Sequence, residues 1–586
     1  MSQVSAIIST ERSNPWFGFF RYADDLAPRR APKPLRHIFS LMRNAECQLL
    51  VEEVVDLSAE WQQERAKLSV IENRTLRTKQ IRISFFKLTS TKPDVDVAKT
   101  FSPVPEDARK NVVNDVEKFR ALCSQEDVHC LGYLYLCTDF QVAVLSTGYE
   151  QEFPLYAFVR EAVVTKEMAP FEKNECYFIH SNAEFKIEVC GHQFPPITGS
   201  YFAQQDKKTY CCAHAASMAC LQNLYTSCQR DCPYTYESLN RQLGVNHLSR
   251  LGSDGLTIEE VQQVFLRAGF RCNTFDSKKG FSPEYVMYAA YSHIECGLPA
   301  VIGFGRGSRS GHAMAIVGHT FEESLWEGAA RQAFKETAPY PFFSSMAWVN
   351  GLIIQDDNFG PYCILPLKEL YASEPAVVAP FFPWSAGLSP MDIQFCACLL
   401  LYQPVLASDT ERLALIDDIC LALDARGINV HSDESMYWFR VLLHHMQRHE
   451  LVLRTVPMTR KEYLGRLNSC LEEVGESIPG ELEDKITDFL PDTPFWLVEI
   501  SIPEIYRRNN RLLGEVLIEC RSGKGGTSAS KSAQPLLARL PGVVSLFSVQ
   551  VHNGLRAVCA DHYSLAMAYH YPICARIPLS KLQFLS

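Results

Sequence analysis

The sequence has no uncharged stretch of the length that a helix needs to span a bilayer, which is about 20 mostly apolar residues. Its first apolar run ends at Ile8 and is followed by Thr10, Glu11 and Arg12, so it is too short for a secretory signal. Basic residues are not in excess either, because 57 Lys and Arg stand against 67 Asp and Glu, for a formal net charge of −10. We therefore expect neither a membrane nor a nucleic acid as a partner.

Sequence motifs for metal and phosphate binding are also missing. Cys228 and Cys232 have no second Cys or His pair at zinc-finger distance. His445 and His449 have the spacing of one helical turn but lack the Glu of a His-Glu-x-x-His motif. The glycine-rich run at 303–311 lacks the Gly-Lys-Ser/Thr ending of a phosphate-binding loop, and a flexible loop explains it better. We expect no cofactor and no metal.

The overall composition is that of a folded protein. Hydrophobic residues make up 47% of the chain and charged residues 21%, which excludes a largely disordered chain. A chain of 586 residues is too long to fold around a single hydrophobic core, so we expect two to four domains. With 21 cysteines and no secretory signal, most thiols are expected to be free in the reducing cytoplasm.

Glycine and proline clusters divide the chain into three parts. One cluster at 191–199 favours a boundary near residue 190, and a series of prolines from Pro375 onward favours another near 370. We expect an α+β protein with a β-rich α+β domain at 1–190, a central domain at 191–370 and a C-terminal α+β domain at 371–586. Periodicity in the flanking domains predicts strands at 48–51, 81–86, 141–145, 495–500 and 512–518, and helices at 107–122, 408–426 and 433–450.

The strongest chemical signal is the segment at 204–216, which reads Gln-Gln-Asp-Lys-Lys-Thr-Tyr-Cys-Cys-Ala-His-Ala-Ala. Small or apolar residues recur with helical spacing after the cysteine pair, so a helix is expected to start near Cys211 or Cys212 and to end before Pro233. A cysteine at a helix N-terminus has a lowered pKa and is a good nucleophile. Gln205 is close enough for its side-chain amide to join the cysteine N–H in an oxyanion hole.

Two later segments supply a histidine and an acid. The run His-Ala-Met-Ala-Ile-Val at 312–317, bracketed by glycines, predicts a buried strand with His312 at its entry. The apolar run at 352–354 predicts a short strand that stops at Asp356 in a turn-forming sequence. An acid there can accept the far imidazole N–H and stabilise the imidazolium. We expect His312 to act as the base and Asp356 to orient it.

With these three segments in this order, residues from about 191 to 370 resemble a papain-like cysteine peptidase, nearer to the short bacterial C39 type than to the lysosomal cathepsins. The run at 312–318 resembles the family's His-Ala-Val-x-x-Val-Gly strand. The resemblance implies Gln205 as oxyanion donor, Cys212 or Cys211 as nucleophile, His312 as base and Asp356 as orienter. It also implies hydrolysis of an amide bond in a protein or peptide through an acyl-thioester.

Three residue assignments have alternatives. The family has one cysteine where this chain has two, and we favour Cys212 because small residues follow it where the helix must pack. Asp357 is the rival orienter, since a slip of one residue in the strand would exchange the two acids. His214 is expected to be bonded locally within the helix and not to serve as a second base.

Two other functions are compatible with the same residues. One is a thiol acyltransferase of the transglutaminase or amidase kind, and the other is a catalytically inactive interaction protein with a papain fold. The flanking domains would select substrate, gate the cleft or bind a regulatory protein partner. Residues 321–347 separate the His312 strand from the Asp356 strand, and we expect them to form an insertion beside the active site, as a lid or a binding segment.

Overall fold

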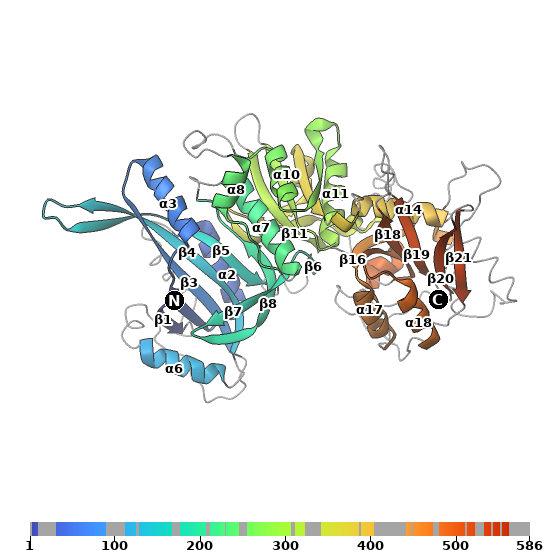
Figure 1. The fold of residues 1–586 in the computed structure, drawn as a ribbon, viewed down its shortest axis with the longest axis horizontal. Coiled ribbons are helices and arrows are strands. Elements are labelled where there is room, and N and C mark those ends of the chain that lie inside the picture. Colours follow the sequence, from blue (N-terminus) through green and yellow to red (C-terminus); the bar gives the residue numbers. More distant parts are fainter. Residues whose placement is uncertain are drawn as a thin grey trace.

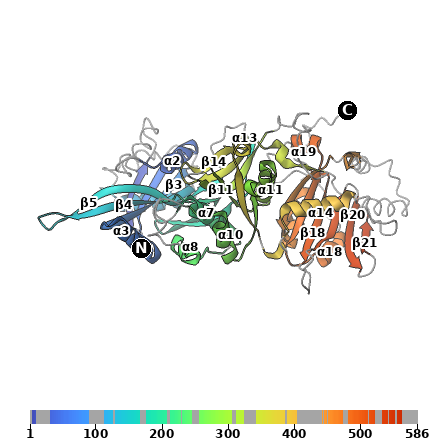
Figure 2. The same cartoon turned by 90° about the horizontal axis from the view of Figure 1, so that it is seen from above.

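The computed structural model describes residues 3–9, 31–88, 112–124, 128–166, 176–206, 211–228, 230–244, 255–305, 311–322, 342–381, 383–385, 388–402, 441–442, 444–446, 448, 450–472, 480–509, 512–521, 532–540, 543–550 and 554–561. Within them the chain is α+β, with three seven-stranded sheets (Figure 1). The view from above shows the three sheets in the same row (Figure 2). No helix of the described residues is long and apolar enough to cross a membrane.

The first sheet is antiparallel and has the strand order β1-β2-β3-β4-β5-β8-β7. Successive side chains on a strand point to opposite faces, and this sheet is covered on both faces. Phe85 of β3 packs against Phe39 of α2 with ring centroids 5.6 Å apart, whereas Phe86 packs against Phe119 of α6 at 5.1 Å. The elements are β1 (Gln3–Ser9), α2 (Lys33–Asn44), β2 (Leu49–Val54), α3 (Ala59–Glu72), β3 (Leu76–Leu88), α6 (Val112–Cys123), β4 (Val128–Val144), β5 (Glu150–Thr165), β7 (Ala183–Val189) and β8 (His192–Phe202).

The second sheet has the order β14-β13-β11-β10-β15-β9, and β6 also pairs with β11. Its middle strand β11 contains the run Met314 to Val317, which is buried, and helix α7 packs against this strand. Helix α10 starts at a capping box in which Thr257 and Glu260 bond each other's backbone N–H. The elements are β6 (Cys176–Ile179), α7 (Cys212–Ser227), α8 (Tyr236–Leu243), α10 (Ile258–Arg267), β9 (Arg271–Asp276), η2 (Ser277–Lys279), α11 (Pro283–Glu295), β10 (Ala300–Gly305), β11 (Gly311–Phe321), β13 (Gly351–Asp356), β14 (Gly360–Pro366), α13 (Leu367–Tyr371) and β15 (Pro375–Phe381).

The third sheet has the order β12-β16-β17-β18-β19-β20-β21, and its β12–β16 pair is parallel. Helix α14 connects the second sheet to the third and packs against β16, β17 and β18. The elements are β12 (Phe343–Ser344), η4 (Ser345–Trp348), η5 (Pro383–Ser385), α14 (Pro390–Tyr402), β16 (Val452–Met458), α17 (Arg460–Glu472), α18 (Gly480–Phe489), β17 (Phe495–Ser501), α19 (Pro503–Asn509), β18 (Gly514–Arg521), β19 (Ser532–Leu540), β20 (Val543–Gln550) and β21 (Gly554–Asp561).

The strands predicted in the flanking regions are confirmed. Those at 48–51, 81–86, 495–500 and 512–518 correspond to β2, β3, β17 and β18, and the one at 141–145 to the end of β4. The helix predicted at 107–122 corresponds to α6, which begins at Val112 in the described residues. The helix predicted at 408–426 lies outside the described residues, as does most of the one predicted at 433–450.

The first two sheets do not end where the glycine and proline clusters predicted. Strand β8 extends the first sheet to Phe202, past residue 190, and β15 extends the second sheet to Phe381, past residue 370. The cluster at 191–199 forms the turn and second strand of the β7–β8 hairpin, since Cys190 and Gly191 both have positive φ, 54° and 76°. Strand β6 precedes this hairpin and yet pairs with β11 of the second sheet. The chain therefore passes between the two sheets more than once.

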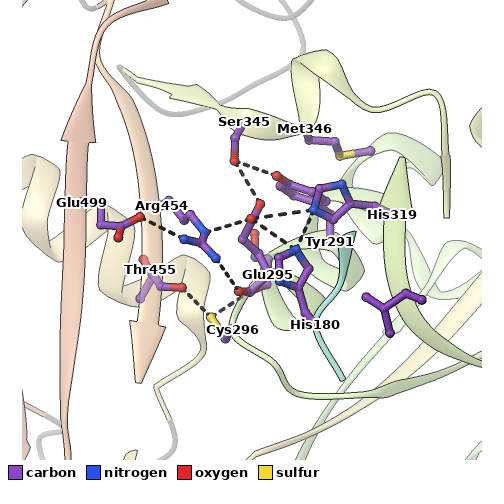
Figure 3. Close-up of polar contacts among 12 residues, drawn as sticks. His180, Tyr291, Glu295, Cys296, His319, Ser345, Met346, Arg454, Thr455 and Glu499 are labelled. Carbon is purple, nitrogen blue, oxygen red and sulfur yellow. Dashed lines mark hydrogen bonds and ion pairs between the residues drawn. The ribbon is translucent and has the colours of Figure 1, made fainter. Parts of the chain in front are cut away.

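A buried arginine joins the second sheet to the third (Figure 3). The side chain of Arg454, on β16, is 2% exposed. Its Nε donates to Oε1 of Glu295, at the end of α11, at 2.8 Å, and its Nη1 donates to Oε2 of Glu499 on β17 at 3.1 Å. The guanidinium of Arg454 thus links its own strand in the third sheet to the neighbouring strand β17 and to helix α11, which packs on the second sheet.

We expect Arg454→Met to destabilise the protein by about 3–5 kcal/mol, because the substitution leaves Glu295 buried without its counter-charge. Thermal unfolding of the full chain measures the effect. Arg77→Met is the matched control, since the side chains of Arg77 and its partner Glu150 are 50% and 55% exposed and exposed ion pairs contribute only about 0–1 kcal/mol. Equal shifts of the unfolding midpoint in the two variants would show that the buried pair adds no more stability than a surface pair.

Candidate active site

The cysteine pair lies at the N-terminus of α7. Cys211 is the N-cap, with extended backbone angles, and Cys212 is the first helical residue. The backbone N–H of Cys211 donates to Nδ1 of His214 at 3.3 Å, and the Cys211 sulfur lies 3.2 Å from the same nitrogen. The helix starts at one of the two predicted positions and ends at Ser227, before Pro233, so the predicted helix is confirmed. His214 makes the local bonds that the sequence predicted.

The pKa values of the two thiols depend on each other. The hydrogen bond from the Cys212 thiol lowers the pKa of Cys211, with help from His214 and against the effect of burial. The same hydrogen bond raises the pKa of Cys212, together with burial and the negative charges of Cys211 and Asp357. A first proton therefore leaves the pair easily and a second one does not. The hydrogen bond between the two side chains therefore favours a state with one thiolate and one thiol.

The two cysteine side chains face different neighbours. The backbone N–H of Ala313, the residue after His312, donates to the sulfur of Cys212. The sulfur of Cys211 faces Gly255, where an added Cβ would lie 3.7 Å from it. Cys211 is the N-cap with an extended backbone and Cys212 is helical, so the two side chains leave the chain in different directions. Of the two, Cys212 is thus the thiol that lies against β11.

His312 and Asp356 meet at the same end of two neighbouring inner strands of the second sheet. His312 is near the start of β11 and Asp356 is at the end of β13, and these strands are antiparallel neighbours. Nε2 of His312 lies 3.0 Å from Oδ1 of Asp356. Burial alone would lower the pKa of His312, but the hydrogen bond and charge of Asp356, together with the charge of Asp357, outweigh it and raise the pKa. Because the acid occupies Nε2, Nδ1 is the ring nitrogen left for chemistry.

Asp357, the alternative orienter, is farther from the ring. Its Oδ1 lies 3.7 Å from Nε2 of His312. Burial raises the pKa of Asp357 to about 7, and the backbone N–H of Gln205 donates to its carboxylate and opposes this shift. Asp356 is therefore the acid nearer to His312, and Asp357 lies between His312 and the Gln205 backbone.

The first sheet holds the residues that precede the cysteines. Gln204 pairs with Val159 of β5 through its backbone N–H, at 3.0 Å, and its side-chain oxygen accepts from the Val159 N–H at 2.9 Å. Arg65 of α3 donates to Asp206 at 2.6 Å. Gln205 lies between these two fixed residues, with a half-buried side chain. Residues 207–210 lie outside the described residues.

Sequence reasoning missed one residue that contacts His312. The side-chain amide nitrogen of Asn358 lies 3.5 Å from Nδ1 and 3.4 Å from Nε2 of His312. The backbone N–H of Asn358 donates to Asp356 Oδ1 at 2.8 Å, so the turn after β13 also fixes the carboxylate. Its position two residues after the acid is a turn signal, and this signal could have identified it.

The described ends of the segment at 321–347 contradict the expected insertion beside the active site. The segment leaves β11 at Phe321, whereas His312 is at the opposite end of that strand. In an antiparallel pair the connection joins the ends that are remote from His312 and Asp356. After residues 323–341, which lie outside the described residues, β12 pairs with β16 of the third sheet. The expected lid over the active site is therefore wrong for the described ends of this segment.

The raised pKa of His312 leads to a prediction for the pH dependence of activity. Asp356→Asn removes the larger of the two charges that raise this pKa and leaves burial, which lowers it, opposed only by the charge of Asp357. The imidazolium would then be lost at a lower pH, so the alkaline limb of kcat/KM is expected to move to lower pH. The pH–rate profile with a peptide substrate measures the shift. Asp357→Asn is the control, and a larger movement of the alkaline limb in that variant would assign the orienting role to Asp357.

Comparison with known proteins does not add to this geometry. No protein-family model matches the chain, and no curated protein matches it. The functional argument therefore depends on the residues themselves.

Proposed function

We propose that the central part of the chain is a papain-like cysteine peptidase that hydrolyses amide bonds in a protein or peptide. One observation carries the proposal. The cysteine pair at the N-terminus of α7 lies next to the His312–Asp356 pair, which is at the ends of two neighbouring strands of the second sheet. A helix N-terminus favours a thiolate, and a carboxylate at Nε2 favours the imidazolium. These are the two charged groups that a thiol hydrolase needs.

In the proposed reaction Cys212 is the nucleophile. A shift of the shared proton from Cys212 to Cys211 moves the thiolate onto Cys212 without adding a second charge to the pair. The thiolate attacks the carbonyl carbon, and the His312 imidazolium gives its proton to the amide nitrogen as the C–N bond breaks. The amine leaves, and an acyl-thioester remains on Cys212.

The second half of the reaction restores the enzyme. Neutral His312 takes a proton from water, and the resulting hydroxide attacks the thioester carbon. The carboxylic acid leaves, the Cys212 thiolate is regenerated and His312 is an imidazolium again. Backbone N–H groups in the first turn of a helix have no partner within the helix, so the N–H of Cys212 can donate to the oxyanion together with the Gln205 amide.

Digestion of a peptide pool tests the proposal. The full chain is incubated with peptides from a denatured protein, and new termini are identified by mass spectrometry beside a Cys212→Ser control. We expect new carboxylic-acid termini that the variant does not produce. An added primary amine separates hydrolysis from acyl transfer, because amine conjugates in place of acids would identify a transglutaminase-type or amidase-type enzyme. Identical peptide pools from the chain and the variant would mean that the fold is catalytically inactive.

The remaining features of the proposal concern its setting. The many cysteines favour a reducing compartment such as the cytoplasm, because the thiolate of the pair would otherwise be oxidised. We also propose that the flanking sheets select the protein substrate or bind a regulatory protein.

A further inference from the structure

A second group of ligand-type side chains lies at the other end of β11, where the second sheet meets the third (Figure 3). It consists of His180, which follows β6, Glu295 at the end of α11, and His319 on β11. Their side chains are 5%, 4% and 2% exposed. None of them takes part in the proposed peptidase reaction, and a purely structural network does not require two imidazoles to face each other.

The three ligand atoms have the spacing of a metal site. Nε2 of His180 lies 2.9 Å from Nε2 of His319, and Oε1 of Glu295 lies 3.6 Å and 3.7 Å from these nitrogens. The point equidistant from three atoms at these separations is about 2.0 Å from each of them, which matches Zn–N and Zn–O bond lengths. One ion at that point would therefore bind all three without movement of the backbone.

The two imidazole rings turn their Nε2 atoms toward each other. Nδ1 of His319 donates to the backbone oxygen of Thr320 at 2.8 Å, so the lone pair is on Nε2, which faces the group. Without an ion, one of the two facing nitrogens has to carry a proton toward the other. An ion would instead use both lone pairs.

Hydrogen bonds from outside the group fix the carboxylate. Oε2 of Glu295 accepts from the Ser345 hydroxyl at 3.2 Å, and Oε1 accepts from Nε of Arg454 at 2.8 Å. A carboxylate has about four lone-pair sites, so Oε1 can accept from the arginine and bind an ion at the same time. The positive charge of Arg454 disfavours a cation, but Glu499 at 3.1 Å offsets part of it. Such outer partners orient metal ligands in proteins.

We propose that His180, Glu295 and His319 bind Zn²⁺. Two imidazole nitrogens and one carboxylate oxygen suit this ion, and a fourth ligand would come from outside the three side chains. The ion would join a strand, a helix and a second strand of the second sheet at the point where Arg454 ties them to the third sheet. Its role is therefore structural, and it does not depend on the proposed peptidase activity.

Zinc analysis of the full chain tests this proposal. The chain is stripped with a chelator, reloaded with Zn²⁺ and analysed for bound metal. We expect about one zinc per chain and a higher unfolding midpoint, because an ion that binds only the folded state stabilises it. His180→Gln is expected to reduce bound zinc by about tenfold or more. His312→Gln is the control, since His312, Asp356 and Asp357 also lie close enough together to hold an ion.

Three results would overturn the proposal. The unaltered chain would bind no zinc after reloading, His180→Gln would keep its zinc, or His312→Gln would lose it. Co²⁺ loading of the unaltered chain gives a second readout that needs no variant, because the absorption bands of bound Co²⁺ report tetrahedral nitrogen and oxygen ligands. The absence of such bands would mean that the group is only a hydrogen-bonded joint between the sheets.

Discussion

Cys212→Ser is expected to lower kcat by about 10⁴-fold or more, whereas Cys211→Ser is expected to keep activity within about tenfold. Only the Cys212 sulfur receives the backbone N–H of Ala313, beside His312. Cys211 caps the helix and bonds His214, and a serine hydroxyl can still serve as a cap. The difference is measured as the turnover of one peptide substrate by the two variants. Both carry the same Cys-to-Ser change, so only its position differs.

Alkylation of a thiol would not separate the two cysteines, because the lowered pKa of Cys211 makes it reactive as well. The acyl-thioester is the decisive species. A peptide ester followed by an acid quench and mass mapping should place the acyl group on Cys212. An acyl group on Cys211, with activity retained in Cys212→Ser, would exchange the roles of the two residues.

His312→Ala is expected to lower kcat/KM by about 10⁴-fold, because the proton of the leaving amine then has no donor in the site. Asp356→Asn is expected to lose less, since an unoriented imidazole still transfers protons. Both rates are measured with the same peptide at the pH optimum of the unaltered chain. If both variants unfold at the same midpoint as the unaltered chain, loss of folding is excluded as the cause.

His214 supplies the matched comparison for His312. It is buried and bonds Cys211, so it is the alternative base. We expect His214→Ala to retain far more activity than His312→Ala, because His214 has no carboxylate partner among the described residues. A greater loss in His214→Ala would move the catalytic dyad to Cys211 and His214, within one helix.

The elements around the cysteine pair, His312 and Asp356 could be predicted because each depends on local sequence. Helical spacing and Pro233 set the limits of α7, glycines bracket the apolar run of β11, and a turn-forming sequence ends β13. Even the distinction between Asp356 and Asp357 follows from which residue ends the strand. Local signals thus predicted both the elements and the positions of the site residues within them.

Features that depend on strand pairing could not be predicted in the same way. The segment at 321–347 was expected near His312 because it follows that strand, but the antiparallel pairing of β11 and β13 puts its described ends at the opposite end. His180 and His319 are 139 residues apart in the sequence, and Glu295 lies between them. They come together through strand pairing that no local sequence pattern specifies. Gly191 was read as a domain boundary because a hairpin turn and a linker have the same composition.

The crossing of the chain between the first two sheets limits how this protein can be divided. β8 ends the first sheet and leads directly into Gln204 and Gln205, while β6 contributes an earlier segment to the second sheet. A fragment that begins at residue 191 would lose β6, β7 and the Val159 and Arg65 contacts that fix the residues before Cys211. Truncation or shuffling at that point would separate the cysteines from their support. The first two sheets therefore have to be kept together in any shortened form of the protein.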